Sequence, residues 1–293
     1  MVRRRKTQQR KQYKMQKFDV VIYITLLLIG IVCLFPIMYV FSVSVTPITE
    51  VYKNGGFVVI PRKVTFEAYK SIFTSSGIPR AMKVTMGVTA VGTISSLIMT
   101  VLAAYPLSIK NLPGRKYLVP IFVFTMLFSG GTIPTYLVVK SLGLTGHYSA
   151  MVIPALISTY NMLVMKAFFE SLPTELSEAA KIDGAGDFSV LCRIIVPLSK
   201  PVMMTVGLFY LVSYWNTYFN ALMYITKDSM QPLQIVLRRL LAASGSLQNA
   251  DQVMPSTTLQ MAAVIVSSIP VLIIYPFLQK YFTKGMVLGA VKG

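Results

Sequence analysis

Half of the carboxylates in this chain, the groups best suited to acid–base or metal chemistry, lie in one short stretch. The stretch is ESLPTELSEAAKIDGAGDFSVLCRIIVPLSKP, residues 170–201. It holds five of the ten acidic residues of the 293-residue sequence: Glu170, Glu175, Glu178, Asp183 and Asp187. No HExxH or GxSxG motif accompanies them, and the single histidine, His147, is too few for a multi-histidine metal site. We therefore expect no catalytic residue, no metal site and no cofactor in this chain.

The elements that must position this stretch are strongly apolar. The chain is 54% hydrophobic and 13% charged, whereas a soluble domain has about 25% charged residues. Its net charge of +18 could suit nucleic acid, but eight of the 28 Lys and Arg residues lie in the first 17 positions. Others flank the apolar runs, which is the pattern that sets membrane topology. We expect an all-α, polytopic membrane protein surrounded by lipid, with no nucleic-acid partner.

Six segments are long and apolar enough to cross a membrane as helices of about 20 residues. They are residues 20–45, 84–109, 118–139, 148–169, 202–225 and 259–282. The basic N-terminal tail predicts a cytoplasmic N-terminus, and six spans return the C-terminus to the same side. The first run is too long for the apolar part of a cleaved signal peptide, so we interpret it as a retained anchor helix.

This topology divides the chain into five parts. Residues 1–19 form a basic cytoplasmic tail, 20–45 the anchor helix, 46–83 an external loop or helix, 84–282 a core of five membrane helices, and 283–293 a cytoplasmic C-terminal tail. The core includes a cytoplasmic loop at 170–201 and an external loop at 226–257. Because acidic residues contribute little to orientation, topology does not explain the carboxylates of the cytoplasmic loop.

Local signals in the cytoplasmic loop predict a helix, a turn and a second helix. Thr174 can cap the first helix, and Asp183-Gly184 marks its end because glycine can adopt a left-handed conformation. An apolar face at helical spacing follows, formed by Phe188, Leu191, Cys192 and Ile195. Pro197 then ends the second helix. These signals fit a loop that docks onto another protein, and equally an amphipathic loop that lies on the membrane.

The segment EAAKIDGAGDFSVLCRIIVPL resembles the EAA loop of ATP-binding-cassette importer permeases. That pattern is Glu-Ala-Ala, three residues, Gly, nine residues, Ile, one residue and Leu-Pro, placed before the penultimate span. The resemblance assigns coupling to an ATPase to eight positions here: Glu178, Ala179, Ala180, Asp183, Gly184, Ala185, Ile194 and Pro197. Val196 stands where the family usually has Leu, which is a mild departure.

The resemblance covers nearly the whole chain. The six spans and the ending YFTKGMVLGAVKG are similar to the smaller permease of maltose-type carbohydrate importers, and residues 128–144 resemble the subgroup that imports oligosaccharides from complex glycans. It implies the type I importer permease fold in the bacterial cytoplasmic membrane, a second similar permease, an ATPase dimer that uses ATP and Mg, and an extracytoplasmic solute-binding protein. No GxxxxGK[ST] phosphate loop is present, so ATP hydrolysis would belong to the partner ATPase.

A path for sugars needs aromatic faces and amide groups within apolar helices. Nine residues of the predicted spans are candidates: Tyr214, Trp215, Asn216, Tyr218 and Asn220 in the fifth, Tyr160 and Asn161 in the fourth, and Ser129 and Tyr136 in the third. In a continuous fifth helix, Tyr214 would neighbour Tyr218 and Asn216 would neighbour Asn220 at i,i+4 spacing. An interfacial aromatic belt or polar helix packing would explain the same residues, and the main sugar site could lie on the partner permease.

Other functions fit the sequence less well. An ion-coupled transporter normally uses ionisable groups inside the membrane, and no Asp or Glu lies within the six predicted spans. A permease of the same family for another small polar solute remains an alternative. Arg238 and Arg239 in the external loop would suit acidic oligosaccharides, but protein docking or salt bridging explains them equally well.

Overall fold

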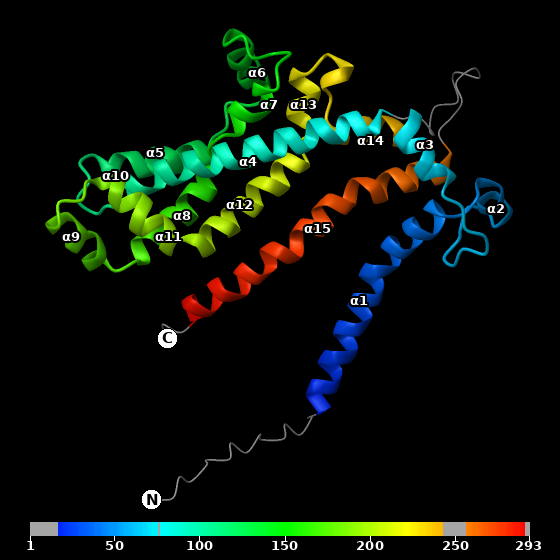
Figure 1. Cartoon of the computed structure of the whole chain (residues 1–293), viewed down its shortest axis with the longest axis horizontal. Helices are drawn as coiled ribbons and strands as arrows, with labels where there is room; N and C mark the ends of the chain where they lie inside the picture. Colours follow the sequence, from blue (N-terminus) through cyan, green and yellow to red (C-terminus); the bar gives the residue numbers. More distant parts are fainter. Residues whose placement is uncertain (1–16, 76, 243–255, 291–293) are drawn as a thin grey trace, which may run out of the picture.

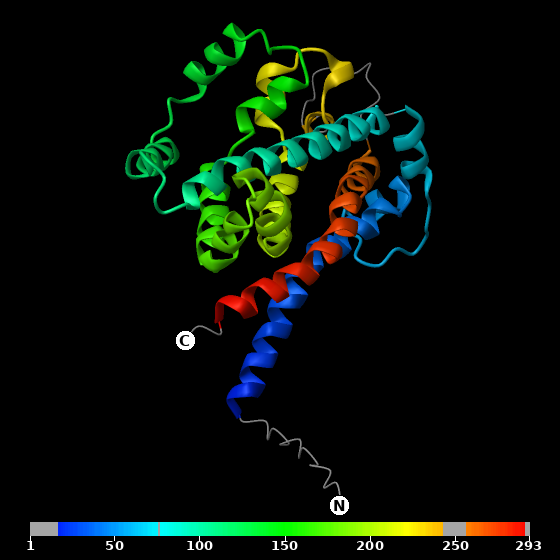
Figure 2. The ribbon, with the colours of Figure 1, turned by 60° about the vertical axis from the view of Figure 1, so that its left-hand side comes forward.

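The computed structural model describes residues 17–75, 77–242 and 256–290, and these residues form helices and connections without any strand. A long helix, α4 (Ile78–Ser108), runs through the molecule (Figure 1). α8 (Thr159–Ser171) and α12 (Lys200–Trp215) pack along α4. α15 (Thr257–Ala290) packs against α12, and α1 (Lys17–Ser44) packs against α15. Both views show α1 and α15 close together at the C-terminal end of α1 (Figure 2).

The described residues provide up to six apolar spans, in agreement with the predicted number. Three helices, α1, α4 and α15, are each long and apolar enough to cross a membrane. Three further pairs of segments qualify only when each bent pair is counted as one span. The predicted first and second spans match α1 and α4 within a few residues, and α15 continues to Ala290, past the predicted end of the sixth span.

The predicted third and fourth spans are broken. α5 (Arg115–Leu127) and α6 (Thr132–Ser141) meet at 114°. The break contains Gly131 at φ +89°, a conformation that residues with a side chain rarely adopt. α7 (Ser149–Val152) continues into the single turn η1 (Ile153–Ala155), which meets α8 at 50°. A continuous helix is therefore wrong for both spans, because apolar composition does not reveal a bend.

The predicted fifth span ends early as a helix. α12 stops at Trp215, and the side-chain amide of Asn216 donates to the carbonyl of Val212 at 2.8 Å. Such bonds from Asn side chains compete with continuation of a helix. α13 (Phe219–Tyr224) begins only after this break. The predicted i,i+4 pairs that join Tyr214 to Tyr218 and Asn216 to Asn220 are therefore wrong.

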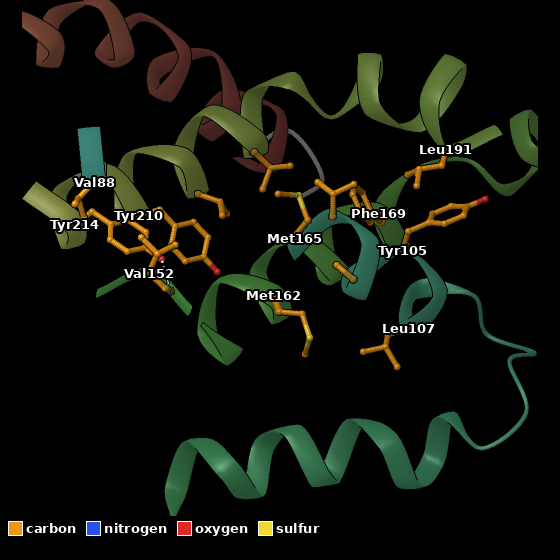
Figure 3. Packing of buried hydrophobic residues seen from close by; sticks show 14 of the residues in the cluster. Val88, Tyr105, Leu107, Val152, Met162, Met165, Phe169, Leu191, Tyr210 and Tyr214 are labelled. Carbon is orange, nitrogen blue, oxygen red and sulfur yellow. Dashed lines mark hydrogen bonds between the residues drawn. The ribbon is translucent and has the colours of Figure 1, made fainter. Parts of the chain in front are cut away.

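The main core lies between α4, α8 and α12 (Figure 3). Small residues of α4 admit the tyrosines of α12, as is common where membrane helices pack closely. The Ser96 hydroxyl lies 2.8 Å from that of Tyr214, and the Thr100 hydroxyl 2.7 Å from that of Tyr210. A Cβ on Gly92 would lie 2.8 Å from three ring carbons of Tyr214. The core thus fixes α12 in register on α4.

Short helices gather at the two ends of α4 (Figure 1). At its N-terminal end lie α2 (Ile48–Lys53), α3 (Glu67–Ser75), η3 (Asp228–Met230) and α14 (Leu233–Ala242). At its C-terminal end lie α9 (Thr174–Ile182), α10 (Asp187–Val190), η2 (Leu191–Ile195) and α11 (Val196–Leu198). The basic tail to residue 16 and residues 243–255 of the predicted external loop lie outside the described residues.

Candidate functional site

The EAA-like segment forms the predicted helix and turn. α9 ends at Ile182, and Gly184 has φ +84°, so the predicted left-handed glycine is confirmed. The Ala185 N–H donates to the Ala180 carbonyl at 2.9 Å, and the Gly184 N–H donates to the Lys181 carbonyl at 3.0 Å. These are the two bonds of a Schellman motif, which satisfies carbonyls at the end of a helix. The turn thereby fixes the angle between the Glu-Ala-Ala helix and α10.

Two local predictions for this loop are wrong. Thr174 does not cap α9: it is the first helical residue, Pro173 occupies the cap position, and no side chain bonds the helix start. Pro197 does not end the second helix. It lies inside α11, which continues α10 and the π-helical turn η2, and the chain bends by 83° only where α12 begins. α11 ends at Leu198, so the helix stops one residue beyond Pro197.

The eight predicted coupling residues divide between two faces of the loop. Ala180, Ala185 and Ile194 pack against the main core. The other five are exposed: Glu178, Ala179, Asp183, Gly184 and Pro197. The inner face therefore anchors the loop to the helical bundle, and the outer face is free to contact another molecule.

Two large apolar side chains extend the outer face of this loop. Ile182 is 86% exposed and Phe188 is 71% exposed. Phe188 was expected on the buried apolar face, which is instead made by Val190, Leu191 and Ile195. Ile182 lies three residues after the exposed Ala179, and this helical spacing places both on one face of α9. Exposed apolar side chains beside polar ones are typical of protein contact surfaces.

Two of the five carboxylates near the loop are paired within the chain. Glu170 Oε1 accepts from Lys166 Nζ at 2.8 Å and from the guanidinium of Arg115. Lys181 Nζ lies 2.7 Å from Asp187 Oδ1, and this hydrogen bond raises the pKa of Lys181. The other three carboxylates are exposed and form no ion pair with any described residue: Glu175, Glu178 and Asp183. These three can meet basic groups of a partner.

A cavity of about 390 Å³, lined by both apolar and polar side chains, lies between the start of α8 and α12. Two predicted pathway residues, Tyr160 and Asn161, line it together with Ser158, Phe209, Tyr210 and Ser213. The rings of Tyr160 and Phe209 lie 6.3 Å apart, and the Ser158 N–H donates to the Tyr210 hydroxyl at 2.9 Å. Aromatic faces beside an amide and hydroxyls can pack on the C–H face of a sugar and bind its hydroxyls.

The predicted residues at the end of α12 do not line this cavity. Tyr214 is buried and bonds Ser96, and its hydroxyl also donates to the Val152 carbonyl at 3.3 Å. Trp215 is 4% exposed and packs with Ile72 and Leu233 in a second apolar cluster between α3, α4, α14 and α15. Both rings therefore contribute to packing in this conformation.

Of the remaining predicted pathway residues, Asn216, Tyr218 and Ser129 lie in the breaks between helices, and Asn220 and Tyr136 lie in the short helices α13 and α6. Asn216 is exposed, and Tyr218 lies beneath the guanidinium of Arg238, 4.7 Å from its ring centroid. Asn220 is partly buried near the start of α13. The Ser129 hydroxyl accepts a hydrogen bond from the N–H of Gly131 in the α5–α6 break, and the ring of Tyr136 stacks on that of Tyr224. These residues are not brought together with the cavity.

The apolar helices, their bends and the anchored loop define a membrane permease of the binding-protein-dependent class. The chain belongs to the family described as binding-protein-dependent transport system inner membrane component, whose model matches residues 90–288. It is therefore a multi-pass protein of the cytoplasmic membrane and a transport subunit, as the sequence predicted.

Named relatives match the chain over almost its full length. It is 42% identical over 286 residues to the polygalacturonan/rhamnogalacturonan transport system permease protein YtcP of Bacillus subtilis (strain 168), covering 96% of this chain and 100% of YtcP. It is 43% identical over 283 residues to protein LplC of the same organism, covering 94% of this chain and 95% of LplC. Both similarities extend well beyond the EAA-like loop.

Solved structures support the same fold. The chain is 31% identical, with a TM-score of 0.85, to a chain of a bacterial ABC transporter involved in the import of the acidic polysaccharide alginate, covering 92% of this chain and 99% of that one. A second chain, from an alginate ABC transporter in complex with an alginate pentasaccharide-bound periplasmic protein, matches at 18% identity and a TM-score of 0.55. The predicted importer permease fold is confirmed.

Proposed function

We propose that this chain is one of two permeases of an ATP-driven importer for acidic oligosaccharides. Three lines support the substrate class: the names of YtcP and of the alginate transporter, the sugar-compatible cavity between α8 and α12, and an external arginine. Arg80, Arg239 and Asp228 line a recess of about 190 Å³ at the end of the molecule opposite the coupling loop, where Arg239 is paired with Asp228 at 3.0 Å. The guanidinium of Arg80 there would suit the carboxylates of a uronic-acid sugar or of a binding protein that carries it.

The outer face of the loop carries the proposed coupling role. Its three unpaired carboxylates and its two exposed apolar side chains lie on α9, on the Schellman turn that follows it and on α10. The loop runs from the end of α8 to the start of α12, and those two helices line the cavity. A partner ATPase that displaces the loop would therefore move both walls of the cavity, which is how ATP binding and hydrolysis on another chain would open or close the path.

The partners follow from the same arrangement. ATP and Mg would bind the ATPase dimer, and an extracytoplasmic binding protein would deliver the sugar at the opposite end, with both termini of this chain in the cytoplasm. α1 exposes apolar side chains from Val20 to Phe41, and of its described residues only Ser42, Val43 and Ser44 are buried inside the chain. A second permease together with lipid would cover such a helix, since exposed apolar faces of this size are satisfied only by one or the other.

The test is uptake by the reconstituted importer in proteoliposomes. With the binding protein and internal ATP, we expect uptake of oligogalacturonides, and little uptake of neutral maltooligosaccharides. Ala179→Leu on the exposed face of α9 should abolish uptake while the permeases and ATPase still co-purify, because a larger side chain disturbs a fitted contact. Ala167→Leu on an exposed position of α8 is the matched control and should retain uptake.

Two outcomes would contradict the proposal separately. Equal uptake of neutral and acidic oligosaccharides would refute the substrate class and leave the coupling role in place. Unchanged uptake and substrate-stimulated ATP hydrolysis by Ala179→Leu would refute the coupling role and leave the substrate class in place.

A further inference from the structure

A second, basic cavity of about 490 Å³ lies at the end of the molecule that carries the coupling loop. Four cationic side chains line it, from the α4–α5 connection, the first turn of α5 and α8: Lys110, Arg115, Lys116 and Lys166. Its apolar wall is made by Leu112, Val119 and Pro120. The cavity therefore combines positive charge with an apolar lining.

The charges of this cavity are only partly neutralised. Glu170 accepts from both Lys166 and Arg115, and Arg115 also donates through Nε to the Leu107 carbonyl at 2.8 Å. Those two cations are thus fixed in place. Lys110 and Lys116 form no ion pair with any described residue. Four cations against one carboxylate leave a surplus of three positive charges, which favours an anionic ligand.

The surroundings indicate that this ligand is amphiphilic. α5 buries none of its residues within the chain, and Leu118, Ile121 and Phe124 are exposed along it. Lys116 Nζ lies over the ring of Tyr117, 5.0 Å from its centroid. Tyrosine and lysine side chains at the end of an apolar helix are typical of the level of lipid headgroups. A phosphate in the cavity would therefore continue into an apolar surface suited to acyl chains.

We propose that this cavity binds the phosphate headgroup of an anionic phospholipid, whose acyl chains lie along α5. Lys110 and Lys116 contact the phosphate, while Glu170 holds the side chains of Arg115 and Lys166 in place at the edge of the cavity. A basic pocket beside membrane helices is a recognised way to bind such headgroups. A free anion would gain nothing from the exposed apolar face of α5. That the leaflet is the cytoplasmic one rests on the proposed coupling role of the neighbouring loop.

The experiment counts lipids bound to the assembled importer in nanodiscs, by native mass spectrometry. The discs contain phosphatidylcholine alone or phosphatidylcholine mixed with phosphatidylglycerol. Lys110→Gln with Lys116→Gln should weaken retention of phosphatidylglycerol about 30-fold, since each lysine near a membrane surface contributes about fivefold to anionic lipid binding. Arg62→Gln with Lys63→Gln, an equal charge change at exposed residues of the α2–α3 connection, should leave retention unchanged.

A second variant tests the sign of the effect. Glu170→Gln frees the charges of Arg115 and Lys166 and should strengthen phosphatidylglycerol retention about fivefold. Equal retention in the Lys110/Lys116 variant and its Arg62/Lys63 control would overturn the proposal. It would also be overturned if inorganic phosphate bound with the same dissociation constant as phosphatidylglycerol, because the acyl chains would then contribute nothing.

Discussion

Gly184 is the position where one methyl group tests whether the shape of the coupling loop matters. Its φ of +84° lies in the left-handed region, and its N–H closes one bond of the turn after α9. A Cβ at this position would meet no heavy atom within 4 Å. Gly184→Ala therefore adds backbone strain and no clash. The left-handed conformation costs a residue with a side chain about 1–2 kcal/mol, which lowers the equilibrium ratio of the turn to other conformations about 5- to 30-fold.

The matched control lies two residues away. Gly186 has φ −71°, and a Cβ there would also meet no heavy atom within 4 Å, so Gly186→Ala adds the same methyl group without strain. We expect substrate-stimulated ATP hydrolysis and uptake by the reconstituted importer to fall about 5- to 30-fold in Gly184→Ala and to stay near wild type in Gly186→Ala. Membrane insertion should be unchanged in both.

Gly184→Pro extends the same series. Proline fixes φ near −65° and removes the N–H that bonds the Lys181 carbonyl, so coupling should be lost entirely. Equal activity of the Gly184→Ala and Gly186→Ala importers would refute the claim that the left-handed turn sets the shape of the loop. Normal substrate-stimulated hydrolysis in Gly184→Pro would refute the coupling role itself.

Two further predictions concern packing and charge. Gly92→Ala should destabilise the importer by about 1–3 kcal/mol, because the new carbon would lie 2.8 Å from the ring of Tyr214. Thermal unfolding in detergent measures this loss of stability. The control is Gly87→Ala, which has open space around its Cβ and should unfold like wild type. The pKa of Lys181 is raised by its bond to Asp187. The full stabilisation from this bond is therefore present at pH values below the usual lysine pKa of 10.5, and it is lost as the pH rises through the raised pKa. NMR titration of ¹³C-methylated lysines should show Asp187→Asn bringing this pKa back to the usual value, and an unshifted titration in wild type would disprove the bond.

The features predicted correctly from the sequence depend on local signals. The apolar runs of α1 and α4 are long enough to define helices by themselves, and a glycine after a short amphipathic helix is enough to define the turn at Gly184. Both depend on residues close together in the chain.

The features that the sequence did not reveal depend on contacts between distant segments. Trp215 seemed suited to a sugar path because it is aromatic and follows other polar and aromatic residues. Its neighbours Ile72 and Leu233 come from α3 and α14, and their contact places the indole in a core. Periodicity within the fifth span could not show this, nor could it show that the helix stops at Asn216. Short apolar runs do not distinguish a straight span from a bent one.

The fold connects the predicted coupling residues to two of the predicted pathway residues, Tyr160 and Asn161. The sequence places the coupling residues and the pathway residues in separate segments, and nothing in it connects them. In the fold, Asn161 near the start of α8 and Ser213 near the end of α12 line one cavity, and the loop joins the opposite ends of the same two helices. Because Ala180 and Ile194 anchor the inner face of the loop to the core, a push on its outer face acts on both helices together. That geometry favours Tyr160 and Asn161 over Trp215 as the residues through which ATP-driven motion reaches the sugar.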